Sequence, residues 1–554
     1  MAAKFGLMTA AVGIAMLGMP AMPAPAQAGP TATFDYLDYQ AIDPAPAAPA
    51  GEYRNPVLPG FHPDPSIVRV DDAFYLVTST FSWFPGLPIF RSTDLVNWEL
   101  IGNAIDRTSQ VDFSGLGTNR GLFAPAITHH DGLFWIVNTC IECGGNFVIT
   151  ASDPAGPWSE PQWLSFGGID PSLVFDDDGT AYIVYNDAPP GEPQYEGHRA
   201  LWIQQFDPAR RAMVGDPTLL VNGGVDLSAK PVWAEGPHIY RVGEWYYLLA
   251  AEGGTADQHS QTIYRSRKVT GPYEPGPFNP ILTQRDLPAD RDDRVEATGH
   301  ADIVQLDDGS WWGVFLATRP FAGQSTLLGR ETFMLPLRWV DGWPRFLDRQ
   351  EAVAMRAARP LLPGATQNIP AKWNDDFTSQ LSDHWIGIRT PGTQQQVIAD
   401  SDAGKLHLIG TGASAGSLDK PSFIGRRMQH PAAQYETRLS FDADGGDFAG
   451  LLAFMDEGHF LAFGREGDRI VARMRSETGD EVAGRIVSAE AAPDSGDITL
   501  RMRIDRGAAT LFWRAGANAR WQQLGGSVNV EPLASVHAGL FTGLVVGPYA
   551  YSPD

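Results

Sequence analysis

Cysteine is scarce in this sequence. Only Cys140 and Cys143 occur among 554 residues, and two thiols cannot supply a four-cysteine zinc site. Their spacing allows a local disulfide in an oxidising compartment, and a reduced thiol pair is the alternative. No βαβ pattern surrounds them, so a thioredoxin-like redox role is not expected. We interpret the pair as structural.

Basic residues are also in short supply. Lysine and arginine number 41 against 65 aspartates and glutamates, which gives a formal net charge of −24 at pH 7. A protein that binds nucleic acid neutralises phosphates with Lys and Arg, so a nucleic-acid partner is not expected. We interpret the acidity as a source of solubility.

Long apolar runs are missing beyond the N-terminal segment, so neither a membrane-spanning helix nor a membrane partner is predicted. Lys4 precedes a short apolar run over 5–19, and Ala26-Gln27-Ala28 matches a cleavage site. Residues 1–28 are therefore predicted to be a removed signal peptide, which predicts a secreted or periplasmic protein. The Ala- and Pro-rich residues 29–51 are predicted to be a flexible lead-in.

What the sequence has in plenty is aromatic residues and one recurring pattern. The 16 Trp, 15 Tyr and 28 Phe suit β-structure and sugar-binding clefts alike. Five copies of one unit contain an opening small or acidic residue, a short apolar strand, an Asp/Gly turn and an aromatic-rich strand. The copies are DPSIVRVDDAFYLVTST from Asp64, APAITHHDGLFWIVNT from Ala124, DPSLVFDDDGTAYIVYND from Asp170, EGPHIYRVGEWYYLLAAE from Glu235 and GHADIVQLDDGSWWGVFLA from Gly299.

The repeated unit predicts an all-β fold. No helical period separates the copies, and further strand-like pieces follow several of them, so each copy is interpreted as a four-stranded propeller blade. A β-solenoid, the alternative, has shorter repeats. We therefore predict a five-bladed β-propeller over residues 52–350. The chain is too long for one core, so a second domain is expected.

The second domain is predicted to be a β-sandwich. Residues 351–370 contain three prolines and are interpreted as a linker. From 371 to 554, short stretches such as QYETRLSFDA and ITLRMRIDR alternate apolar and polar residues. This pattern is typical of an antiparallel sandwich of jelly-roll, concanavalin A-like type.

The starts of the five inner strands should meet at the propeller axis. Three of them, Asp64, Asp170 and Glu235, are carboxylic acids, and carboxylates that are brought together repel one another. Each aspartate could simply cap its own turn, because Asp-Pro-Ser is a good turn sequence. Three converging copies favour a functional site instead. Ala124 and His300 open the other two blades.

Paired carboxylates in an aromatic cavity suit glycoside hydrolysis. One carboxylic acid protonates the leaving oxygen while the other activates water or attacks the sugar, so their pKa values must be pushed apart. Calcium binding is the other use of clustered carboxylates. The sequence contains no D-x-D-x-D-G loop, and DDDG at 176–179 is interpreted as a hairpin turn.

Several longer motifs resemble glycoside hydrolase family 43. The similarity extends from about Asn55 to the end of the chain and is greatest to the two-domain β-xylosidases and α-L-arabinofuranosidases, in which a five-bladed propeller precedes a β-sandwich. The resemblance implies an exo-acting, inverting glycosidase that needs no cofactor. The motifs are NPVLPGFHPDPSIVRV, SFGGIDPSLVFDDDG, WAEGPHIYRVGEWYYLLAAEGGT, GHADIV, LGRETF and, in the second domain, PSFIGRRMQH.

By position, the resemblance implies a role for each carboxylate. Asp64 matches the general base that activates water, Glu235 the general acid, and Asp170 the carboxylate that tunes and orients the acid. In an inverting enzyme, base and acid are about 6.5–9.5 Å apart. Further substrate contacts are implied at Phe81, Phe123, Thr255, His300, Arg330 and Phe541.

Three of these contacts carry further expectations. Phe123 stands where relatives often have Trp, so an apolar wall is kept but the indole donor is lost. Phe541 lies in FTGLVVGPYAY, where the sandwich of relatives closes the pocket, which implies cleavage at chain ends. His300 matches a histidine that lies near calcium in some relatives, so it is the one metal candidate, for a structural calcium on the axis.

The preferred function is the removal of β-D-xylose from xylo-oligosaccharides during xylan degradation. Removal of α-L-arabinofuranose from arabinoxylan or arabinan, alone or in addition, is the alternative, because the two sugars present similar hydroxyl groups. A sugar-binding propeller without catalysis is the third hypothesis, but it would not need all three carboxylates. The oligomeric state, including a homo-oligomer, is left open.

Overall fold

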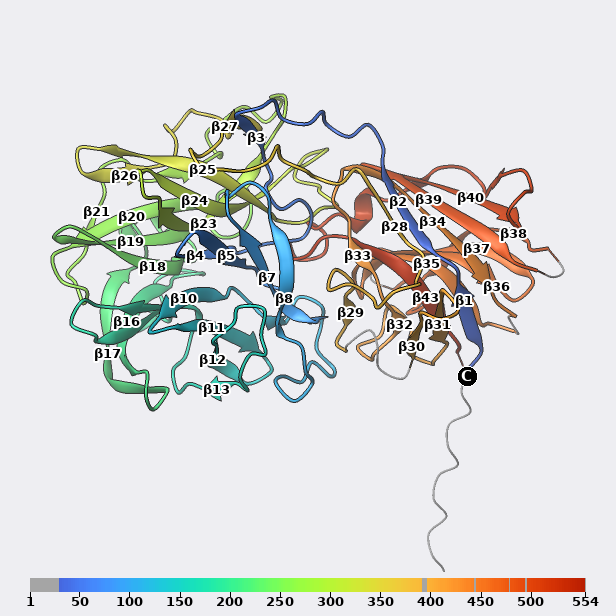
Figure 1. Cartoon of the computed structure of the whole chain (residues 1–554), viewed down its shortest axis with the longest axis horizontal. Helices are drawn as coiled ribbons and strands as arrows, with labels where there is room; N and C mark the ends of the chain where they lie inside the picture. The colour runs from blue at the N-terminus through green and yellow to red at the C-terminus, as the bar shows by residue number, and fades with distance from the viewer. Residues whose placement is uncertain (1–28, 391–395, 443–444, 478, 494–495, 554) are drawn as a thin grey trace, which may run out of the picture.

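The chain folds into two all-β domains, a five-bladed propeller and a β-sandwich, which lie side by side (Figure 1). Both predicted architectures are confirmed. The predicted signal peptide, residues 1–28, lies outside the described residues. The computed structural model describes residues 29–390, 396–442, 445–477, 479–493 and 496–553.

Each propeller blade is a four-stranded antiparallel sheet, and the first strands of neighbouring blades contact one another around the axis. Two short strands, β9 and β22, extend the second and fourth blades. In chain order the blade strands are β4 (Ser66–Val70), β5 (Ala73–Val77), β7 (Gly86–Ser92), β8 (Glu99–Ile105); β9 (Gly121–Leu122), β10 (Ala126–His130), β11 (Leu133–Ile141), β12 (Gly145–Ala151), β13 (Gln162–Trp163); β14 (Ile169–Phe175), β15 (Ala181–Asp187), β16 (Ala200–Asp207), β17 (Ala212–Asn222); β18 (Glu235–Val242), β19 (Trp245–Glu252), β20 (Ser260–Ser266), β21 (Glu274–Pro275), β22 (Leu282–Thr283); and β23 (Glu296–Gln305), β24 (Trp311–Thr318), β25 (Glu331–Val340), β26 (Trp343–Arg345).

The predicted Asp/Gly turns join the first two strands of the blades. In the second blade, His130 pairs with Leu133 across Asp131 and Gly132, whose φ angles are 49° and 73°. A two-residue type I′ hairpin turn needs both central residues in this left-handed region, which Gly and Asp tolerate best. The Asp/Gly pattern in the sequence therefore reflects the left-handed backbone conformation that the turn requires.

The propeller ring is closed where the fifth blade meets the first. The Asp302 carboxylate in β23 accepts hydrogen bonds from the Ser66 hydroxyl at 2.6 Å and from the Ile67 amide at 2.9 Å. Nearby, β3 (Glu52–Arg54) pairs with β27 (Arg356–Ala358), so the segment before the first blade is tied to the segment after the last.

The sandwich consists of two antiparallel sheets that enclose one large apolar core. The short strand β6 (Trp83–Phe84) of the propeller pairs with β29 (Gly387–Ile388) across the domain boundary. The first sheet contains β1 (Thr31–Phe34), β2 (Leu37–Ala41), β28 (Lys372–Asp375), β30 (Val397–Asp400), β31 (Lys405–Ile409), β34 (Ala432–Ser440), β39 (Ile498–Asp505), β40 (Ala508–Ala515), β41 (Gln522–Gln523) and β42 (Val528–Asn529), and the second contains β32 (Ser422–Phe423), β33 (Arg426–Arg427), β35 (Phe448–Asp456), β36 (His459–Glu466), β37 (Arg469–Arg475), β38 (Arg485–Ala491) and β43 (Val545–Tyr551).

The expectation of a flexible lead-in over residues 29–51 is wrong for its first half. β1 and β2 belong to the sandwich, where β1 pairs with β31 and β34, and β2 with β28 and β34. Phe34 and Leu37 are fully buried in the sandwich core. Figure 1 shows these blue strands within the orange and red domain. The burial of their apolar side chains outweighs the Ala/Pro-rich composition that follows them.

Helical structure is almost absent from the described ranges, which contain only the 3-10 turns η1 (Leu227–Ala229) and η2 (Glu531–Leu533). Neither turn has the length or the apolarity that a membrane crossing requires.

Candidate active site

The starts of the five inner strands surround one cavity of about 220 Å³ at the propeller axis. This is smaller than the roughly 300–1,000 Å³ of pockets for drug-sized ligands, and it suits a single sugar ring. All nine predicted site residues line it, together with Ala124. The lining residues are Asp64, Phe81, Phe123, Ala124, Ile169, Asp170, Trp233, Glu235, Gly254, Thr255, His300, Arg330 and Phe541.

An unusual backbone aims the site residues into this cavity. Asp64 lies two residues before β4, Asp170 is the second residue of β14, and His300 lies within β23. Their φ angles are 52°, 53° and 52°, a left-handed conformation that costs free energy in residues other than Gly. The strand register shifts just after Asp170 and Glu235, and such bulges re-aim side chains near functional sites. Phe81 and Trp233, which also line the pocket, share this left-handed conformation.

Gly236 explains how Glu235 and His300 share this space. Gly236 has a φ of 56°, and a Cβ atom there would lie 2.6 Å from Nε2 of His300. Only glycine at position 236, directly after Glu235, leaves room for the imidazole ring of His300.

Asp64 is held by several donors. Nη1 of Arg330 donates to its Oδ1 at 3.0 Å and Nη2 to its Oδ2 at 3.4 Å, and the Ser79 hydroxyl also donates to Oδ2. Arg330 is fixed in turn by Thr255, whose Oγ1 accepts from Nη1 at 3.1 Å. His300 lies with Nδ1 3.6 Å from Oδ1, and burial lowers its pKa to about 4, so its ring is neutral.

The other two carboxyl groups have raised pKa values. Asp170, 6% exposed, accepts a hydrogen bond from Nδ2 of Asn186 at 3.1 Å. Burial, and then the charge of Asp64, raises the pKa of Asp170 to about 7. Glu235 is half-buried and makes no side-chain hydrogen bond in the described part of the chain. Burial, followed by the charges of Asp170 and Asp64, raises the pKa of Glu235 well above its ordinary value.

Three aromatic rings form an aromatic wall of the pocket. Phe81 and Phe123 from the propeller have ring centroids 5.4 Å apart, and Phe541 from the sandwich lies 5.4 Å from Phe81 and 5.8 Å from Phe123. The Phe541 loop is anchored by the hydrogen bond from the Leu544 amide to the Leu327 carbonyl, at 2.8 Å. The sandwich therefore supplies part of the pocket wall, as expected.

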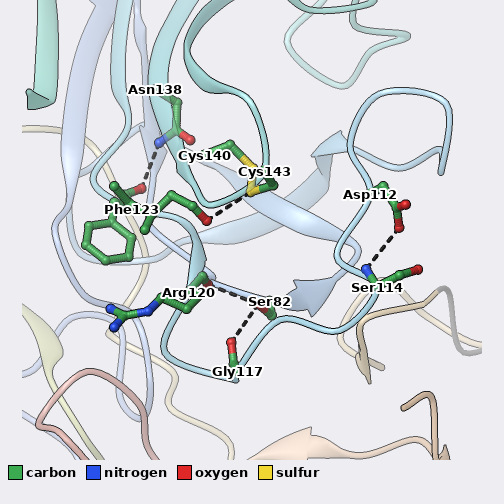
Figure 2. The surroundings of a disulfide bond; sticks show 10 residues. Ser82, Asp112, Ser114, Gly117, Arg120, Phe123, Asn138, Cys140 and Cys143 are labelled. Atoms are coloured by element: carbon green, nitrogen blue, oxygen red, sulfur yellow. Dashed lines mark hydrogen bonds between the residues drawn. A yellow bond between two sulfur atoms is a disulfide. The ribbon is translucent and has the colours of Figure 1, made fainter. Parts of the chain in front are cut away.

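A disulfide between Cys140 and Cys143 lies near Phe123 of this wall (Figure 2). It closes the turn between β11 and β12, where Cys140 is in register with Leu122 of β9. Nδ2 of Asn138 donates to the carbonyl oxygen of Phe123 at 2.7 Å. The disulfide alternative is the one that the structure shows, and its turn supports the strand that leads to Phe123.

Trp233, Ile169 and Gly254 are lining residues that the sequence did not single out. Trp233 is 36% exposed, and the guanidinium carbon of Arg199 lies 4.6 Å from the centroid of its ring. Trp233 precedes Glu235 by only two residues, and this closeness in the sequence could have identified it as a pocket residue. Its exposed face gives the pocket mouth an aromatic surface.

A calcium ion near His300 stays a prediction. The described residues include no group of three or more His, Cys, Asp or Glu side chains arranged to hold a metal ion. Calcium prefers six to eight oxygen ligands, whereas the nearest carboxylate to His300, Asp64, is already occupied by Arg330 and Ser79. The residues present do not fit a calcium centre, and no step below depends on one.

Two family models match the chain. The first, described as "Glycosyl hydrolases family 43", matches residues 53–344, which is more than half of the chain. The chain belongs to glycosyl hydrolases family 43. The second model, "Beta xylosidase C-terminal Concanavalin A-like domain", matches residues 374–554 and covers the sandwich of this family-43 protein.

Similar proteins support the assignment to family 43. The non-reducing end alpha-L-arabinofuranosidase of Bacteroides ovatus is 36% identical over 509 residues, which cover 90% of this chain and 91% of that protein. A xylosidase/arabinosidase of Butyrivibrio fibrisolvens is 34% identical over 516 residues, covering 90% and 96%. A GH43_12 protein retrieved from a capybara gut metagenome has a TM-score of 0.86 at 36% identity, covering 95% of this chain and 100% of that one. The protein is therefore a glycoside hydrolase.

Proposed function

We propose that this family-43 enzyme removes single β-D-xylose residues from the non-reducing ends of xylo-oligosaccharides, with inversion at the anomeric carbon. The observation that carries the proposal is the small pocket in which three carboxyl groups face an aromatic wall completed by the second domain. Because the pocket has room for about one ring, a chain can enter only by its end.

The chemistry follows from the unequal surroundings of the carboxyl groups. Glu235, protonated because its pKa is raised, donates its proton to the glycosidic oxygen as the bond to the leaving sugar breaks. Asp64, which Arg330 and Ser79 hold in place, takes a proton from the water that attacks the opposite face of the sugar. Asp170 keeps the acid protonated through its charge.

Removal of α-L-arabinofuranose is the second candidate. It is supported by the Bacteroides ovatus relative, whose name gives that activity, and by the xylosidase/arabinosidase name of the Butyrivibrio fibrisolvens relative. The same carboxyl groups would carry out the same inverting reaction, so the two candidates differ in the sugar and not in the mechanism.

A direct comparison of two substrates tests the proposal. We expect faster release of 4-nitrophenol from the β-D-xylopyranoside than from the α-L-arabinofuranoside, and a large loss on both in Asp64→Asn, because both reactions need an activated water. A dominant arabinofuranoside rate would keep the mechanism and change the substrate. Activity on neither substrate, with a folded protein, would contradict the proposal.

The stereochemistry needs a separate measurement. Proton NMR during the first minutes of xyloside hydrolysis should show α-xylose appearing before mutarotation mixes the anomers. Initial formation of β-xylose would mean retention, and it would exclude Asp64 as a base acting through water.

We also propose that the enzyme acts in the periplasm or outside the cell. The disulfide between Cys140 and Cys143 supports this location, because such bonds persist in oxidising compartments. Cell fractionation with N-terminal sequencing tests it: we expect cleavage after Ala28, and an uncleaved cytoplasmic protein would contradict it.

A further inference from the structure

A second cavity, of about 890 Å³, lies between the first propeller blade and the sandwich, and it shares no lining residue with the central pocket. Its wall includes His62 from the segment before the first blade, Trp98 beside β8, and Trp373, His384 and Arg426 from the sandwich side. This interdomain groove therefore joins side chains of both domains.

Arginines in the groove wall and behind it have no acidic partner. Among the described residues, the Arg426 side chain makes no hydrogen bond or ion pair, and its guanidinium carbon lies 4.0 Å from the ring centroid of Trp373. Its neighbour Arg427 is 8% exposed and leaves Nε without a partner. Burial lowers the pKa of each to about 10. In a chain with 65 acidic and 41 basic residues, two adjacent unpaired arginines require an explanation.

His62 gives a second, independent sign of a ligand. It is 7% exposed, lines the groove, and leaves Nδ1 without a hydrogen-bond partner. Burial lowers the pKa of His62 well below its ordinary value, and the charges of Arg427 and His384 lower it further. A buried polar atom left unpaired costs about 1–3 kcal/mol, so the fold keeps an unsatisfied imidazole nitrogen beside the groove that His62 lines.

The carboxylates near the groove are either exposed or engaged by another side chain. Glu99 and Asp383 line the groove but are exposed side chains. Asp375 attracts Arg426 only at a distance, because it makes no ion pair with it and already accepts from Nε1 of Trp385 at 2.7 Å. Among the described residues, no carboxylate forms an ion pair with the Arg426 or His384 side chains that line the groove.

We propose that the interdomain groove binds a small oxyanion, either phosphate or the carboxylate of an acidic sugar, between Arg426, His62 and His384. A guanidinium offers paired N–H donors that match the oxygens of either group. Further polar side chains along the groove, Asn368, Gln380, Ser382 and Gln429, supply donors and acceptors for hydroxyl groups. Because Arg426 and His62 come from different domains, the bound anion would hold the domains together.

Calorimetric titration of the protein tests this site, with inorganic phosphate, D-glucuronate and D-glucose as separate probes at constant ionic strength. We expect saturable binding of at least one anion, no binding of glucose, and a matching rise in the unfolding temperature. The anion that binds more tightly shows whether the site selects phosphate or the carboxylate of an acidic sugar. Saturable binding of neither anion, or equal binding of glucose and glucuronate, overturns the proposal.

Three variants locate the binding. Arg426→Gln and His384→Gln should each weaken anion binding at least tenfold, whereas Arg506→Gln, which changes an arginine on the exposed surface of the sandwich, should leave it unchanged. Equal affinity in the wild type and His384→Gln, a substitution of an exposed side chain that is not expected to disturb folding, contradicts the assignment even where Arg426→Gln is poorly folded.

Discussion

The two sides of the active-site pocket are built differently. On the propeller side, Asp64 and Asp170 are buried, sit on left-handed backbone and are hydrogen-bonded by residues of the propeller itself. On the sandwich side, one half-exposed ring, Phe541, rests on a loop. The propeller blades therefore supply the catalytic carboxyl groups, whereas the second domain supplies part of the wall that closes the pocket. Substitutions on the two sides should affect different kinetic constants.

The largest effect is expected on the propeller side. Glu235→Gln should reduce kcat/KM for xylobiose by about 10²–10⁴-fold, because that substrate needs a proton on its leaving oxygen. The loss on 4-nitrophenyl xyloside should be much smaller, since nitrophenol leaves without acid assistance. Asp64→Asn should reduce both rates alike, because both reactions need an activated water. Equal losses for the two substrates in Glu235→Gln would show that this residue is not the acid.

Asp170→Asn should alter the pH dependence of the reaction. The Asp170 carboxylate raises the pKa of Glu235, so its removal lets the acid ionise earlier. The alkaline limb of kcat/KM should move to lower pH, and Asp178→Asn, which changes an exposed turn residue, serves as control. An unmoved limb would show that Asp170 does not act through Glu235.

The same substitution should also change how stability depends on pH. Because the folded pKa of Asp170 is raised to about 7, the fold is favoured below pH 4 and loses that advantage as the pH rises to about 7. Asp170→Asn should therefore gain in unfolding temperature relative to the wild type between pH 4 and pH 8. A constant difference over this range would contradict the raised pKa.

A smaller effect is expected on the sandwich side. Phe541→Ala should raise KM about threefold to tenfold with little change in kcat, since an aromatic contact contributes about 0.5–1.5 kcal/mol. Phe321→Ala is a matched control, because Phe321 packs against the sandwich core but does not line the pocket. A fall in kcat of the same size as in Glu235→Gln would mean that the sandwich also shapes the chemistry.

The smallest effect is expected from the disulfide. Cys140 and Cys143 are three residues apart, and closing so short a loop stabilises a fold by about 2 kcal/mol in the chain-entropy model. Thermal unfolding of the wild type should shift modestly to lower temperature with a reductant present, whereas Cys143→Ser should not respond. A response of similar size in that variant would show that the reductant does not act through this disulfide.

The repeated features of the molecule could be predicted from the sequence, whereas features that occur only once could not. Five equivalent strand starts predicted the blades and, through them, the meeting of Asp64, Asp170 and Glu235. Phe541 came only from the family resemblance. The strands over 31–41 were missed because their partners lie about 400 residues away in the sequence. The interdomain groove was missed because it forms only where the two domains contact each other, and no local sequence pattern predicts that contact.

The position of β1 and β2 has a consequence for how the protein is made. These strands are synthesised before the propeller, yet β34, with which both pair, is synthesised after it. The whole propeller is translated in between, and domains generally fold as units as they emerge. The propeller is therefore an insertion between two parts of the sandwich, and the sandwich cannot be completed until β34 is available to pair with β1 and β2.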